Sequence, residues 1–64
     1  MSYDPKHLLQ IVAANLQRRR HELNLSQQEL AERSQVSRRM ISLIERGESN
    51  VSLATLGHLA AALG

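Results

Sequence analysis

The segment from Ser26 to Arg46, SQQELAERSQVSRRMISLIER, constrains the fold of this chain more than any other part of the sequence. It contains two short helical patterns, each preceded by a serine, with a turn of about three residues between them. A serine at a helix start accepts hydrogen bonds from backbone N–H groups that lack an intrahelical partner, and Glu29 completes a capping box with Ser26. Two short helices joined by so tight a turn cannot pack antiparallel. We therefore expect them to cross steeply, as a helix-turn-helix.

The composition favours one all-helical domain over residues 1–64. The chain has no cysteine, which excludes disulfides and cysteine-ligated zinc. Its one aromatic residue is Tyr3, in the N-terminal tail, so the core must be aliphatic. The aliphatic residues recur with a period of about 3.6 and never alternate as in a strand. The predicted fold class is all-α, a compact bundle of four to five short helices.

Capping residues delimit the predicted helices. The first begins at Pro5 with Asp4 as its N-cap, and Asn24 suits its exit. Gly47 suits a left-handed C-cap after the third helix, and Ser52 opens the fourth. Helices are thus predicted over about 5–23, 27–34, 38–46 and 53–63. The expected core residues are Leu8, Leu9, Ile11, Val12, Leu16, Leu23, Leu25, Leu30, Ala31, Met40, Ile41, Ile44, Leu53, Leu56, Leu59, Ala60 and Leu63.

The third predicted helix, which Ser37 opens, has an unusual polar face. At about 100° per residue its apolar residues gather on one side. The other side carries arginines, although lysine and glutamate would serve solubility as well. Arginine forks match guanine edges and phosphates, and an aliphatic side chain can touch a thymine methyl group. The residues on this side are Arg38, Arg39, Ser42, Leu43 and Arg46.

This face indicates sequence-specific binding of double-stranded DNA, with helix 38–46 in the major groove. The net charge of +2 permits nucleic-acid binding without demanding it, but arginine supplies seven of the eight basic residues. The alternative is an ordinary solvated face, with Leu43 as a fourth core residue of the helix. We favour the DNA-binding interpretation because the face belongs to a capped helix pair.

The segments LSQQELAERSQVS, ISLIERGESN and SLATLGHLAAALG, between Leu25 and Gly64, resemble the Xre or Cro-type helix-turn-helix of phage repressors and bacterial regulators. The resemblance covers roughly two-thirds of the chain. It implies a lambda-repressor-like fold and the DNA-binding domain of a prokaryotic transcriptional regulator. The segment RRMISLIERGESNVSLATL is also similar to regulators that continue into a C-terminal cupin sensor domain.

The resemblance implies a role for each matching residue. Arg38 and Arg39 match the leading base contacts, and Leu43 matches a later one, with Ser42 on the same face. Gln27, the first residue of the second helix, matches a glutamine that grips a phosphate through its backbone and side chain. Further contacts to the DNA backbone are expected from Gln28, Ser37, Arg46 and Asn50.

Arg20 and Glu45 match a charged pair that ties the first helix to the recognition helix. The alternative for Arg20 is a surface arginine near a helix C-terminus, where the helix dipole favours it. We give both interpretations equal weight.

The chain departs from the family pattern at three positions. Gln35 occupies a turn position that is often glycine, which costs roughly 1 kcal/mol if its φ is positive. Leu43 replaces a common glutamine, so a methyl contact takes the place of a hydrogen bond and the target sequence should differ. Val51 replaces a common proline, which should loosen the loop before the fourth helix.

The sequence contains no recognisable enzyme or metal site. His7, His21 and His58 lack ligand spacing, and the capping serines lack the base and orienting group that a nucleophile needs. We expect no catalytic activity, no metal and no cofactor.

We expect the natural protein to form a homodimer on a two-fold operator with half-sites about one helical turn apart. The chain stops where the fourth helix ends, which suggests a fragment of a longer regulator, itself monomeric or weakly dimeric. No signal pattern or membrane-spanning run is visible, so the expected location is the cytoplasm, at the nucleoid. The alternative function is a protein-interaction module of the same fold, of the antitoxin or co-activator type, whose arginines and Leu43 bind an acidic partner.

Overall fold

The computed structural model describes residues 4–64, so Tyr3 lies outside the described part. That part contains four helices and no strand, which confirms the all-α prediction. The helices are α1 (Pro5–Glu22), α2 (Gln27–Ser34), α3 (Arg38–Glu45) and α4 (Leu53–Leu63). α1 and α3 each end one residue before the predicted end, because Leu23 and Arg46 are C-caps. Within residues 4–64, none of the helices is long and apolar enough to cross a membrane.

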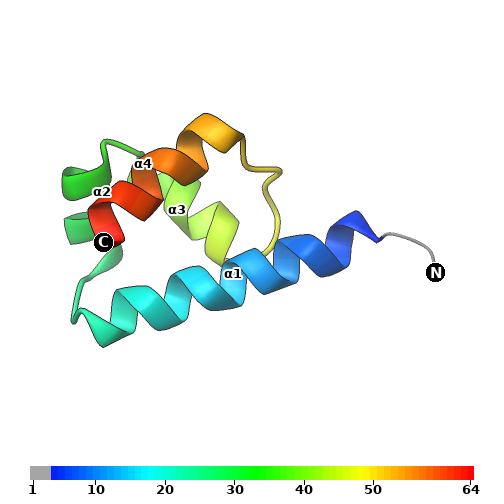
Figure 1. Ribbon diagram of the computed structural model, residues 1–64, viewed down its shortest axis with the longest axis horizontal. Helices are drawn as coiled ribbons and strands as arrows, with labels where there is room; N and C mark the ends of the chain where they lie inside the picture. The colour runs from blue at the N-terminus through cyan, green and yellow to red at the C-terminus, as the bar shows by residue number, and fades with distance from the viewer. Residues whose placement is uncertain (1–3) are drawn as a thin grey trace.

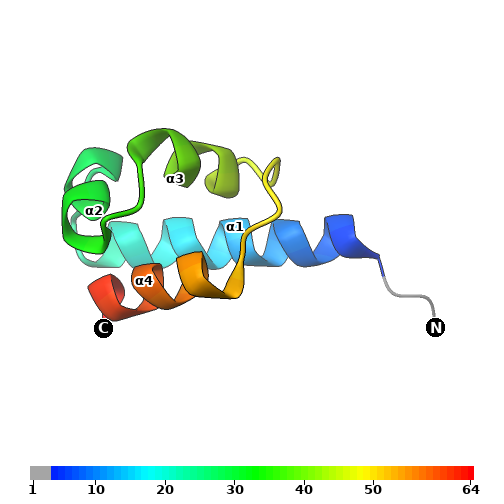
Figure 2. The ribbon, with the colours of Figure 1, turned by 90° about the horizontal axis from the view of Figure 1, so that it is seen from above.

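α1 runs along the length of the molecule, and its first turns project beyond the other helices (Figures 1 and 2). α3 and α4 lie on either side of α1 in the view of Figure 2. α1 packs against α3, while α2 packs against both α3 and α4. α3, the second helix of the helix-turn-helix, is therefore packed against both α1 and α2.

Local capping accounts for the helix starts. Ser26 Oγ accepts a hydrogen bond from the Glu29 backbone N–H at 3.0 Å, and Glu29 Oε1 accepts from the Ser26 N–H at 2.9 Å. This reciprocal capping box begins α2 as the sequence predicts. The N-caps of the other helices are Asp4, Ser37 and Ser52.

The turn between α2 and α3 is built from residues 35–37. Gln35 takes the left-handed conformation, with φ 62°, and its N–H donates to the Ala31 carbonyl at 2.9 Å. Ser34 is buried, and its hydroxyl oxygen accepts from the Val36 N–H at 3.1 Å. These bonds turn the Val36 side chain into the core, so the turn is part of the packed structure.

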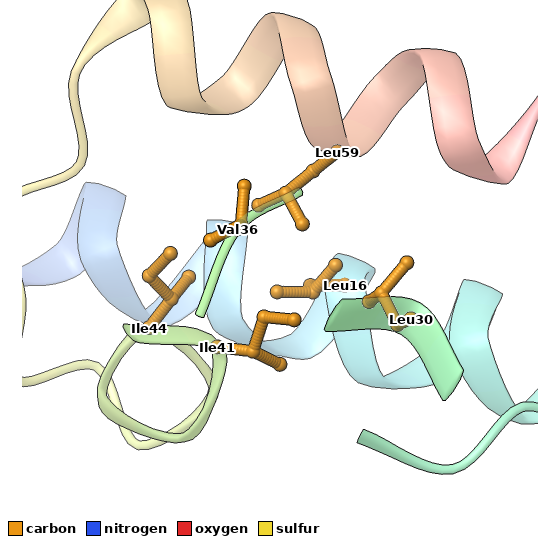
Figure 3. Close-up of a cluster of buried hydrophobic side chains, with 6 residues drawn as sticks. All are labelled: Leu16, Leu30, Val36, Ile41, Ile44 and Leu59. Carbon is orange, nitrogen blue, oxygen red and sulfur yellow. The ribbon is translucent and has the colours of Figure 1, made fainter. Parts of the chain in front are cut away.

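Every helix contributes to one small aliphatic core (Figure 3). Leu30, Ile41 and Ile44 are the largest fully buried side chains, which anchors α3 by its apolar face. The buried cluster consists of Leu16, Leu30, Val36, Ile41, Ile44 and Leu59.

The predicted core was wrong at several positions. Leu8 and Ile11, in the first half of α1, are 46% and 44% exposed. Leu53, the first residue of α4, is 86% exposed, because the helix reaches the core only further along. The predicted core residues that the structure leaves exposed are Leu8, Ile11, Leu23, Leu53 and Ala60.

Candidate nucleic-acid interface

The exposed side of α3 forms a shallow surface hollow of about 340 Å³. Its three arginines are exposed, while Ser42 and Leu43 are half-buried. Leu43 is therefore not a fourth core residue of α3. The hollow brings together all the residues expected on this side, which are Arg38, Arg39, Ser42, Leu43 and Arg46.

A second hollow lies at the junction of α2 and α3, and Gln28, Ser37 and Arg38 are among its lining residues. Arg38 lines both hollows, so the two surfaces are continuous. Ser37 Oγ accepts from the Met40 N–H at 3.0 Å as the N-cap of α3. Its hydroxyl hydrogen remains available as a donor. The junction thus places hydrogen-bond donors beside the exposed side of α3 that carries Arg38, Arg39 and Arg46, which we call the arginine face.

Gln27 makes a contact that the sequence did not predict. Its Nε2 donates to Glu45 Oε1 at 3.1 Å, so the side chain is directed to the end of α3. An amide Nε2 carries two hydrogens, which leaves one N–H for another acceptor. Gln27 is also the first residue of α2, where backbone N–H groups lack intrahelical partners.

Arg20 and Glu45 form a buried two-pronged ion pair. Arg20 Nε donates to Glu45 Oε2 at 2.7 Å, and Arg20 Nη2 donates to Glu45 Oε1 at 2.8 Å. The third nitrogen, Nη1, donates to the Leu25 carbonyl at 2.9 Å. The Arg20 side chain is only 11% exposed, so it is not a surface arginine.

Glu45 also accepts from α1 through its backbone, because Gln17 Nε2 donates to the Glu45 carbonyl at 2.6 Å. Sequence reasoning missed Gln17. A signal was present, since Gln17 precedes Arg20 by three residues and shares its helix face. Glu45 thus joins α1, α2 and α3, and it fixes the end of the helix that carries the arginine face.

The charge state of this pair follows from its contacts. Burial alone would raise the pKa of the Glu45 carboxyl, but hydrogen bonds from Arg20 and Gln27 and the Arg20 charge outweigh it. The pKa of Glu45 is therefore below its ordinary value. The hydrogen bond to Glu45 raises the pKa of Arg20. Both groups are ionised at neutral pH.

The C-terminal end of α3 closes with a Schellman motif. The Gly47 N–H donates to the Ile44 carbonyl at 2.9 Å, and the Glu48 N–H donates to the Leu43 carbonyl at 3.0 Å. Gly47 has φ 71°, as its predicted capping role requires. Asn50 is exposed in the loop that follows. The structure therefore places Asn50 after the arginine face, without a contact to it that would define its role.

These features define a class of protein, a helix-turn-helix domain whose second helix presents arginines to solvent. A family model described as helix-turn-helix matches residues 16–64, which include the end of α1 and all of α2, α3 and α4. The chain belongs to this helix-turn-helix family, the Xre-like DNA-binding domains of transcription regulators, as its resemblance predicts.

Two curated proteins are similar over most of the chain. An uncharacterised HTH-type transcriptional regulator, y4dJ, of Sinorhizobium fredii is 43% identical over 54 residues, which cover 84% of this chain and 70% of that protein. Control protein C.SmaI of Serratia marcescens is 48% identical over 54 residues, which cover 84% of this chain and 64% of that protein. No solved structure gives a significant match.

Proposed function

We propose that this domain binds double-stranded DNA sequence-specifically as part of a prokaryotic transcriptional regulator. In this proposal α3 enters the major groove and α2 crosses the sugar-phosphate backbone. The observation that carries it is the hollow on α3, where three arginines flank a serine and a leucine on the side opposite the core. The name of one relative, an HTH-type transcriptional regulator, supports regulation of transcription as the context, and the other relative is named a control protein.

Base recognition is assigned to four of the residues that line this hollow, which are Arg38, Arg39, Ser42 and Leu43. Arg38 and Arg39 match the guanine O6 and N7 acceptors, because a guanidinium can donate to both at once. Leu43 offers methyl groups to a thymine, and Ser42 can donate to or accept from either partner of a base pair. A half-site with guanine and thymine in adjacent contacts fits this set.

Contacts to the DNA backbone are assigned to residues at the edges of the arginine face. Gln27 offers its second amide N–H and the N-terminus of α2 to one phosphate. Further phosphate contacts set the register of α3 on the duplex in this proposal. They are assigned to Gln28, Ser37, Arg46 and Asn50.

The regulator is proposed to act as a homodimer on a two-fold operator, with half-sites about 34–36 Å apart. Its place of action is then the nucleoid, and no catalytic step is assigned to it. The C-terminal cupin sensor domain stays a prediction from the sequence.

The first experiment is a ¹⁵N amide-shift titration with a mixed-sequence duplex at low and then higher salt. We expect shifts at Gln27, Gln28 and residues 37–50 that weaken with added salt, since binding releases counterions from phosphates. Absence of shifts at high concentration contradicts DNA binding by this chain. Shifts that resist salt would favour a protein-binding role for the face.

A target sequence selected from a random library then tests the roles of the residues. Arg38→Ala and Arg39→Ala should each cost about 1–3 kcal/mol on the selected site and relax base preference. Gln27→Ala should weaken binding on all sequences alike. Arg18→Ala is the matched control, because Arg18 is an exposed arginine on α1 that does not line the hollow. An equal loss on all sequences for Arg38→Ala and Arg39→Ala contradicts their base-contacting role.

A further inference from the structure

Arg46, one of the three arginines of the α3 hollow, is held by a carboxylate. Arg46 Nε lies 3.1 Å from Glu48 Oε2, and the two side chains are 59% and 56% exposed. The acidic group thus lies at the border of the surface proposed to meet DNA. A phosphate that approaches Arg46 has to compete with this carboxylate.

The position of Glu48 is set by the backbone. Its N–H is the one that donates to the Leu43 carbonyl in the Schellman motif after α3. The preceding residue, Gly47, supplies the positive φ that this motif needs. Glu48 is therefore fixed against the end of the recognition helix, within reach of a residue two positions earlier.

Stabilisation of the fold does not explain this carboxylate. An ion pair between two well-exposed side chains contributes little to stability. A negative charge is also unfavourable near a helix C-terminus, where the macrodipole is itself negative. Glu29, by contrast, lies in the first turn of α2 and completes its capping box. Glu48 has no such local role for its side chain.

We propose that Glu48 is an electrostatic brake on DNA binding, a carboxylate that competes with phosphates for Arg46. This inference rests on the proposed function. When the domain docks, Arg46 exchanges the carboxylate for a phosphate, and the displaced negative charge remains beside the DNA backbone. Because every sequence presents the same phosphates, the brake lowers affinity for all duplexes alike and leaves base preference unchanged. It limits non-specific binding by a domain with seven arginines.

The test measures binding of Glu48→Gln to fluorescent duplexes of mixed and of selected sequence, from 50 to about 200 mM salt. Glutamine keeps the backbone N–H of the Schellman motif, and circular dichroism verifies the fold. We expect binding to tighten about threefold to tenfold at low salt on both duplexes. Arg46 contacts a phosphate in both proteins, so the slope of log affinity against log salt should change little, and the gain should shrink as added salt screens the Glu48 charge.

The chain offers a matched control in Glu22→Gln. Glu22 pairs with Arg19 on α1 at 3.5 Å, and these side chains are 45% and 53% exposed, so the same charge is removed from a similar pair. We expect it to change affinity less than about twofold, because Glu22 lines neither hollow and its partner Arg19 is not among the proposed DNA contacts. In an Arg46→Gln background, Glu48→Gln should give no more than this control effect.

Three results would overturn the brake. The first is an equal change of affinity in Glu48→Gln and Glu22→Gln, which would show that the change follows from net charge alone. The second is a gain that persists without Arg46. The third is weaker binding of Glu48→Gln, which would show that Glu48 favours DNA binding. An altered base preference would likewise contradict the brake, because it would make Glu48 a base contact. If the unaltered chain binds no duplex at any salt concentration, the proposed function itself fails and the brake fails with it.

Discussion

At the scale of single residues, three of the left-handed positions that follow helices differ in backbone strain. Asn24, Gln35 and Gly47 have φ of 56°, 62° and 71°. Glycine has no Cβ to clash with the following carbonyl, and asparagine tolerates this region through local hydrogen bonds. Glutamine has neither advantage. Gln35 is therefore the strained residue of the helix-turn-helix turn.

Gln35→Gly should stabilise the domain. Relief of the left-handed strain outweighs the extra entropy that glycine brings to the unfolded chain, so the free energy of unfolding should rise by about 0.5–1 kcal/mol. Urea denaturation measures this change. Asn24→Gly is the control and should gain less, because asparagine already accepts the conformation. A loss of stability in Gln35→Gly would show that its side chain makes a favourable contact.

At the scale of helices, Glu45 connects α3 to the rest of the bundle. Its carboxylate is 5% exposed and accepts from Arg20 and Gln27, while its carbonyl accepts from Gln17. α1 and α2 thus meet α3 at one charged residue. Such a pair costs desolvation, but it sets the register of the helices that carry the arginine face.

Removing one partner of the Arg20–Glu45 pair should lower the free energy of unfolding severely, whereas replacing both partners should lower it only mildly. Glu45→Gln leaves Arg20 buried without an anion, which should cost about 3–5 kcal/mol. A domain of this size has only about 3–10 kcal/mol in total, so thermal melting should show most of the variant unfolded. The double variant Arg20→Met with Glu45→Met should recover much of the loss. A double variant no more stable than Glu45→Gln would show that the pair itself is indispensable for folding. Glu22→Gln, at an exposed pair, should stay within about 0.5 kcal/mol of the parent.

The pair also predicts how stability depends on pH. The pKa of Glu45 is lower in the folded state than its unfolded value of about 4.3, so the unfolded chain binds the proton first. The stabilisation is present above that value and is lost as the pH falls through the folded pKa. Denaturation at a series of pH values should show the parent losing stability on acidification more steeply than the double variant. Equal slopes would contradict the role of Glu45. Glu29, whose pKa the Ser26 backbone N–H lowers, adds a slope of the same sign to both proteins.

At the scale of the whole molecule, the core is small and off-centre. It lies where α2, α3 and α4 meet the middle of α1, and the start of α1 lies outside it (Figures 1 and 3). A groove of about 270 Å³ remains between α1 and α4. Stability therefore depends on a few side chains, and apolar residues of one helix differ widely in importance.

Two leucines of α4 should show this difference. Leu59 is 2% exposed and belongs to the buried cluster, so Leu59→Ala should cost about 2–5 kcal/mol. Leu53 is 86% exposed, so Leu53→Ala should change the free energy of unfolding by less than about 0.5 kcal/mol. Chemical denaturation of the two variants under identical conditions compares them. Similar losses would contradict the placement of Leu53 in solvent.

The sequence alone was sufficient to predict the helices, their caps and the side of α3 that faces solvent. These features depend on residues within about four positions of one another, such as Ser26 with Glu29, so they can be recognised along the chain. The helix-turn-helix family was recognisable for the same reason, since its spacing and caps are local. Boundaries were missed only at Leu23 and Arg46, which end their helices as caps.

Only the tertiary structure decided which apolar residues are buried and which polar groups meet. Leu8 and Ile11 fit the helical pattern as well as Leu16, but burial requires another helix opposite them. The bond from Gln17 to the Glu45 carbonyl spans 28 residues, and so no local pattern contains it. The Arg20–Glu45 pair spans 25 residues, and only the family resemblance had suggested it as one of two alternatives for Arg20. The sequence determined the elements and the chemistry on their faces. Their packing determined which apolar residues on those faces are buried and which distant polar groups meet.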